Sequence, residues 1–177
     1  MKKIILVSCL TLFVALLGIH IYTIESIKSK LSPIVVKDDL LFEQHWIKTG
    51  ETHTADKWIA ILNSEIEQRN GIILAISSLY PYIYRKELEI YIELLKKENE
   101  YALVLRSTLN EQKDKVLNEK DHDKVQRIDK RIVDLAKQNQ NNIAELIKLE
   151  ECREKEMSSI LPKRNILPLL KNAVSKQ

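Results

Sequence analysis

The feature that most constrains this chain is an almost uninterrupted apolar run over residues 4–24. About 20 apolar residues is the length that a helix needs to cross the hydrocarbon core of a bilayer. The few hydroxyl side chains in the run can hydrogen-bond to the preceding helical turn, so they do not prevent insertion. The sequence therefore predicts a membrane anchor over residues 1–30. The side chains expected to contact lipid are Ile4, Leu6, Leu12, Phe13, Leu16, Leu17 and Ile21.

A cleavable signal peptide is the alternative, because it also combines lysines with an apolar core. Such a peptide needs small residues at the first and third positions before the cut. A cut after Gly18 would place the bulky Leu16 at the upstream position, and the apolar run continues through Ile24. The segment around Cys9 resembles a bacterial lipobox, but almost no hydrophobic region precedes it. These observations favour an uncleaved signal-anchor.

Charges around the run predict its orientation. Lys2 and Lys3 precede it, whereas the lysines that follow are diluted by acidic residues such as Glu25 and Asp38. Positive flanking charge remains on the cytoplasmic side of a membrane. We therefore expect a single pass through the inner (cytoplasmic) membrane, with a cytoplasmic N-terminus and the bulk of the chain in the periplasm.

The composition beyond the anchor predicts an all-α protein. The chain has 177 residues with only three glycines and four prolines, and 30% of its residues are charged, a pattern typical of long helices. Its excess positive charge lies at the two ends, because residues 162–177 contain four basic and no acidic side chains. A nearly neutral body lacks the basic face of a nucleic-acid-binding protein, so no nucleic-acid partner is expected.

Two long helices with matching apolar seams are predicted in the second half of the chain. Alternating steps of four and three residues through residues 84–116 meet apolar side chains except at Glu98 and Gln112, and a similar seam follows in residues 125–149. This spacing is typical of coiled-coil helices. The sequence predicts that they form an elongated antiparallel bundle with a long coiled-coil hairpin.

A polar segment separates these helices, in which Asn118 can end the first helix and Asp121 can cap the second. A fold-back near Lys120 would bring Val116 against Val125 and would place the polar residues 138–142 opposite Glu98. Buried asparagines can fix the register of a coiled coil. A solvated bend is the alternative explanation of this polar stretch.

Two further helices are predicted between the anchor and the hairpin. A stripe from Trp58 to Tyr80 has helical spacing and is interrupted by Arg69, and a shorter helix covers residues 34–48. Pro33 should separate this shorter helix from the anchor or kink the junction. Residues 31–161 thus form the expected extracytoplasmic bundle.

No constellation of catalytic residues is recognisable in the sequence. The four histidines are scattered and no His-Glu-x-x-His motif is present, so we expect no metal site, no catalytic residues and no cofactor. Glu65 and Arg69 lie four residues apart, as do four other pairs of opposite charge. This spacing favours surface pairs that stabilise a helix. The chain is therefore expected not to be an enzyme.

Two groups of residues remain as candidates for binding. Trp58, Tyr84 and Tyr91 could line a pocket between helices, although core packing is the favoured explanation of these aromatic residues. The tail, residues 162–177, leaves apolar side chains that must be covered by its own bundle, by a partner or by an anionic membrane surface. The residues of the tail predicted to bind a partner are Ile166, Leu167, Leu169, Leu170, Lys163 and Arg164.

The order of anchor, coiled-coil hairpin and short basic tail resembles the inner-membrane spanins of phages. The bundle is also similar to the four-helix sensing domains of bacterial chemoreceptors, but a second membrane span and a cytoplasmic signalling region are lacking. We expect a non-enzymatic scaffold or interaction subunit of a bacterial cell-envelope assembly, whose partners are membrane lipid and other envelope proteins or further copies of itself. The alternatives are a periplasmic four-helix sensing module and a lysis or exclusion factor of a phage or mobile element.

Overall fold

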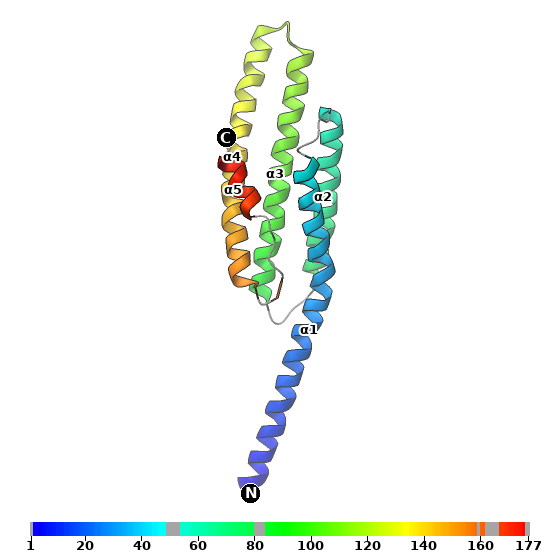
Figure 1. The fold of residues 1–177 in the computed structure, drawn as a ribbon, viewed down its shortest axis with the longest axis vertical. Coiled ribbons are helices and arrows are strands. Elements are labelled where there is room, and N and C mark those ends of the chain that lie inside the picture. Colours follow the sequence, from blue (N-terminus) through cyan, green and yellow to red (C-terminus); the bar gives the residue numbers. More distant parts are fainter. Residues whose placement is uncertain (1, 49–53, 80–83, 159, 162–166, 176–177) are drawn as a thin grey trace.

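The chain is all-α, as the sequence predicts. The computed structural model describes residues 2–48, 54–79, 84–158, 160–161 and 167–175, and within the helices it leaves out the side chains of residues 2–7, 42–44, 46–48 and 172–175. The described residues form the helices α1 (Lys2–Lys48), α2 (Ala55–Ser77), α3 (Arg85–Leu117), α4 (His122–Glu156) and α5 (Leu167–Ser175). Figure 1 shows an elongated molecule in which the first half of α1 projects alone from the bundle.

Helix α1 is continuous over 47 residues and contains Pro33 in its interior. The sequence predicted that Pro33 would either separate two helices or kink their junction. The predicted separation is wrong, because the helix does not end at Pro33. Pro33 lies on the exposed side of α1, where water can hydrate the carbonyl that loses its hydrogen bond. Burial begins at Ile27 and is complete at Leu31 and Val35. One helix thus supplies both the projecting segment and a wall of the bundle.

The projecting segment has the length and composition of a membrane span. The stretch Ser8–Leu41 meets both criteria, and its most apolar part is almost entirely exposed. Thr23 donates a hydrogen bond from its hydroxyl to the carbonyl oxygen of Ile19 over 2.8 Å. The Thr23 hydroxyl is thus hydrogen-bonded within its own helix, as the sequence predicts for hydroxyl side chains in the apolar run.

The hairpin of α3 and α4 has the predicted turn and register. Asn118 follows the last residue of α3, and the Asp121 side chain caps α4 by accepting a hydrogen bond from the backbone N–H of Lys124 over 3.0 Å. Ion pairs join Lys115 to Asp129 at 2.6 Å and Lys97 to Glu145 at 2.6 Å. Figure 1 shows that the end of this hairpin extends beyond α1 and α2.

The apolar seam is not buried at the end of the hairpin. Val116, which was expected to pack against Val125, is 71% exposed, and Leu117 is 77% exposed. The cause is the missing third helix, because α2 begins beside Lys113 of α3, with which Asp56 forms an ion pair, and leaves the hairpin end beyond it as two helices alone. We call residues 116–122 the hairpin tip.

The core lies where four helices run side by side, nearer to the projecting segment of α1 than to the hairpin tip. Close backbone packing joins α3 to α4, α2 to α3, α1 to α2 and α5 to α4. The buried apolar side chains of this region include Leu31, Val35, Ile72, Ile76, Leu88, Leu94, Leu95, Ile143, Leu146 and Leu170.

Candidate functional site: a buried ionic cluster

The interior of the bundle contains charged side chains as well as apolar ones. Burying a charge is costly unless it is paired and hydrogen-bonded, so such groups are informative about the design of the core. The described polar residues that are buried are Asp38, His45, Glu65, Arg69, Glu98, Asn99, Asn142, Glu150 and Arg153.

Four of these residues form what we call the ionic cluster: His45 of α1, Glu65 and Arg69 of α2, and Glu98 of α3. His45 Nδ1 hydrogen-bonds Glu65 Oε2 over 2.9 Å. Arg69 donates from Nε to Glu98 Oε2 over 2.9 Å, and from a terminal nitrogen to Asn99 Oδ1 over 2.9 Å. The cluster therefore connects three helices through charge-assisted hydrogen bonds, which are the strongest kind available to side chains.

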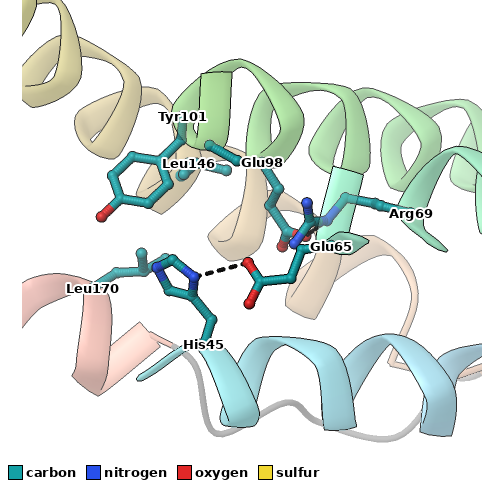
Figure 2. A pocket seen from close by; sticks show the side chains of 8 residues that line it. His45, Glu65, Arg69, Glu98, Tyr101, Leu146 and Leu170 are labelled. Atoms are coloured by element: carbon teal, nitrogen blue, oxygen red, sulfur yellow. Dashed lines mark hydrogen bonds and ion pairs between the residues drawn. The ribbon is translucent and has the colours of Figure 1, made fainter. Parts of the chain in front are cut away.

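A small cavity lies beside the ionic cluster (Figure 2). The four residues of the ionic cluster line it together with Tyr101, Ala102, Leu146 and Leu170. Its volume is about 20 Å³, which is room for roughly one water molecule. Pockets for small organic ligands measure roughly 300 to 1,000 Å³, so this cavity is too small for such a ligand in the closed bundle.

Two aromatic rings, those of Trp58 and Tyr101, pack against His45. The ring of Trp58 lies edge-on to the imidazole at a centroid distance of 6.2 Å, and the ring of Tyr101 lies edge-on at 6.0 Å. Edge-to-face packing of this kind is the preferred geometry of aromatic pairs. The end of α1 is thus fixed both by an ionic contact and by ring packing.

Replacing Tyr101 with phenylalanine is expected to make the bundle less sensitive to alkaline pH. Burial raises the pKa of the Tyr101 hydroxyl above its ordinary 10.0, while a hydrogen bond with Asn139 lowers it in part and the charge of Glu65 raises it. Because the folded state favours the neutral hydroxyl, stability is intact below pH 10.0 and falls as the pH rises above it. One such group contributes at most about 1.4 kcal/mol per pH unit.

The measurement is urea unfolding of both proteins at about pH 8 and about pH 11, on either side of the ordinary tyrosine pKa. The unfolding free energy of the unaltered protein should fall more between these two values than that of Tyr101→Phe. An equal fall in the two proteins would show that the Tyr101 hydroxyl is as easily ionised in the fold as in the unfolded chain.

A second group of polar side chains lies nearer the end of the bundle from which α1 projects. The hydroxyl of Tyr91 donates to Asp38 Oδ2 over 2.7 Å, and the guanidinium of Arg153 lies 5.4 Å from the centre of the Tyr91 ring. Arg153 also donates to Glu150 Oε1 over 3.1 Å. Tyr91 therefore connects α1 to α4 through α3, in addition to filling the core.

The aromatic residues predicted to share a pocket are not brought together. Tyr91 is fully buried in the core, and Tyr84 packs against the same core at the start of α3. Asp56, two residues before Trp58, forms an ion pair with Lys113. This contact places Trp58 level with about residue 110 of α3, which at 1.5 Å per residue is roughly 30 Å or more from the two tyrosines. Only Trp58 lies near the cavity, through its contact with His45.

The predicted anchor and tail residues are placed only in part. Leu12, Phe13, Leu16, Leu17 and Ile21 are between 48% and 64% exposed on the projecting segment, whereas the side chains of Ile4 and Leu6 lie outside the described residues. In the tail, Leu167 is half-buried, Leu169 is 38% exposed and Leu170 is buried in this chain's own core. Lys163, Arg164 and Ile166 lie outside the described residues.

The interpretation of Glu65 and Arg69 as a surface pair is wrong. Both side chains are buried, and they contact His45 and Glu98 rather than each other. The sequence contained a signal for this arrangement, because Arg69 interrupts one apolar stripe and Glu98 interrupts another. Two interruptions of opposite charge in facing stripes indicate a buried ion pair when the helices are antiparallel.

The described residues include no group of three or more His, Cys, Asp or Glu side chains arranged to hold a metal ion. Comparison with known proteins identifies no relative: no family model, no curated protein and no solved structure matches this chain.

Proposed function

We propose that this protein is a non-enzymatic, single-pass membrane scaffold of a bacterial cell envelope, with its N-terminus in the cytoplasm and its bundle in the periplasm. The observation that carries the proposal is the continuity of α1. Its exposed apolar half is the candidate membrane span, and its second half is buried in the bundle without a break between them. A force or a displacement applied to the bundle would therefore be transmitted directly to the anchor.

The polar contacts of the interior support a rigid scaffold. His45 and Asp38 connect α1 to Glu65 of α2 and to Tyr91 of α3. At the surface, Lys97 also forms ion pairs with Glu100 and with Glu145 of α4, and these two hydrogen bonds raise the lysine pKa, but such exposed pairs add little stability. Hydrogen bonds of fixed geometry specify one arrangement of helices more strictly than apolar contacts alone.

The hairpin tip is the surface that such a scaffold would present to a partner. Helix α3 contains 33 residues, so at 1.5 Å per residue the tip stands roughly 50 Å from the membrane-side end of the bundle. Val116 and Leu117 are the most exposed aliphatic residues there. Exposed apolar side chains at a projecting end are typical of contact sites for other proteins.

Photo-crosslinking tests this proposal. A photoreactive amino acid at Val116 in the full chain, expressed in bacterial membranes, is expected to give a discrete adduct with an envelope protein or with a second copy. Leu74 is the matched control, because it is also 71% exposed and lies on α2 toward the membrane-side end. Two differently tagged copies in one cell distinguish self-association from a different partner. Equal crosslinking at both positions, or none at Val116, would contradict the scaffold.

A further inference from the structure

Helix α5 packs against α4 beside a part of the bundle where α1 and α4 do not approach each other closely. In the described residues, α1 packs closely by its backbone against α2 alone, and α4 packs closely against α3 and α5. No close backbone approach joins α1 to α4 in this part of the chain. Figure 1 shows α5 lying along α4, beside the level of the core.

Leu170 is the side chain through which α5 reaches into this part of the bundle. It is 3% exposed and lines the cavity together with His45 of α1, Glu98 of α3 and Leu146 of α4. Figure 2 shows Leu170 at the side of the cavity occupied by the His45 ring. An apolar side chain at this position shields the ionic cluster from bulk solvent.

Little else of what the structure describes holds α5 in place. Lys171 forms an ion pair with Glu151 of α4 at 2.9 Å, but both side chains are about half exposed, and such pairs contribute little. Leu169 is more exposed than Leu170, with an exposed fraction of 38%. A helix of nine residues is also too short to be stable in isolation. Among the side chains of α5 that the structure describes, Leu170 is the one that is fully buried, whereas Leu167 is half-buried. We therefore expect Leu170 to contribute more to the docking of α5 than its described neighbours do.

We propose that α5 is a displaceable latch on the ionic cluster and on the bundle half of α1. When α5 is docked, Leu170 separates the cavity from bulk solvent, and the contacts of His45 and Glu65 operate in a low-dielectric interior. When α5 detaches, water enters, the attraction between the charged groups weakens, and the last turns of α1 lose a restraint. A partner that binds the tail through Leu170 must compete with the bundle, so its binding would loosen α1. This role is separate from that of the hairpin tip.

Hydrogen exchange followed by mass spectrometry tests the latch on the full chain in detergent micelles. Leu170→Asp should detach α5 and speed amide exchange by roughly tenfold or more in the backbone of residues 36–48 of α1. Exchange at the hairpin tip and in residues 8–22 should change by less than about twofold. Leu169→Asp is the matched control, because it places the same charge one residue earlier on the exposed side, and it should leave α1 unchanged.

Two results would overturn the latch. One is faster amide exchange in α5 alone, which would mean that α5 packs on α4 without restraining α1. The other is an equal response to Leu169→Asp and Leu170→Asp. If Leu170→Asp unfolds the whole bundle, Leu170→Ala decides the matter, because it shortens the side chain without adding a charge. It should give a smaller increase in the same α1 segment, and an unchanged α1 would reject the proposal.

Discussion

Replacing Arg69 with methionine is expected to lower the free energy of unfolding by about 3 to 5 kcal/mol, because breaking a buried ion pair leaves an uncompensated charge. Arg69 is 4% exposed, and its guanidinium hydrogen-bonds both Glu98 and Asn99. Methionine fills a similar volume but provides no donor, so the carboxylate of Glu98 would remain buried without its cation. Urea unfolding of the full chain in detergent, followed by circular dichroism, measures the change.

Arg106→Met is the matched control for this substitution. Arg106 also donates a hydrogen bond to a side chain of α2, from a terminal nitrogen to Asn63 Oδ1 over 2.7 Å, but it does so near the surface. Its replacement should change stability by less than about 0.5 kcal/mol. The double variant Arg69→Met with Glu98→Leu should recover most of the loss, since an apolar pair of similar volume can replace a buried ion pair. Equal effects of Arg69→Met and Arg106→Met would contradict the importance of burial.

Introducing two arginines into the exposed part of α1, Leu12→Arg with Leu16→Arg, is expected to abolish membrane insertion. Each arginine near the centre of a transmembrane helix costs about 3 kcal/mol on insertion scales. We expect the free-energy cost of inserting two arginines to outweigh the favourable insertion energy of the remaining apolar residues. An alkaline phosphatase fused after Gln177 should be active in the unaltered protein, because this enzyme folds only outside the cytoplasm, and inactive in the double variant.

The double variant Val36→Arg with Leu40→Arg controls for the charge itself. These two residues lie on the same helix and are 52% and 50% exposed, but they belong to the bundle half of α1. Phosphatase activity and sedimentation with membranes should therefore be retained. An active fusion in Leu12→Arg with Leu16→Arg would argue against α1 as the anchor, and an inactive fusion in the unaltered protein would place the bundle in the cytoplasm.

The sequence was sufficient to predict the elements whose boundaries depend on local chemistry. Asn118 and Asp121 mark the hairpin turn because an amide and a carboxylate satisfy backbone groups at helix ends. The register followed from matching two apolar seams, since a shift along either helix would expose them. These features need no knowledge of distant contacts.

The buried polar contacts and the docking of α5 could not be predicted, because they depend on which helix faces pack against each other. Arg69 and Glu98 were recognisable as interruptions, but their pairing requires the relative height of α2 and α3. The burial of His45 depends in addition on α1 continuing through Pro33, which local rules disfavour. The docking of Leu170 depends on a cavity formed by residues of several helices. Each of these features depends on contacts between distant residues, and the local sequence is compatible with more than one such arrangement.

With α1 as the proposed membrane anchor, its continuity couples the position of the bundle to the tilt of the span. Helix α1 passes through Pro33 without ending, so a tilt of the span is carried into the bundle except for what bending at Pro33 absorbs. Transmembrane helices commonly tilt by about 20°, and over roughly 50 Å this inclination sweeps the far end sideways by roughly 17 Å. Bilayer thickness, through the tilt it imposes, would thus set the radius within which the protein can reach a neighbour.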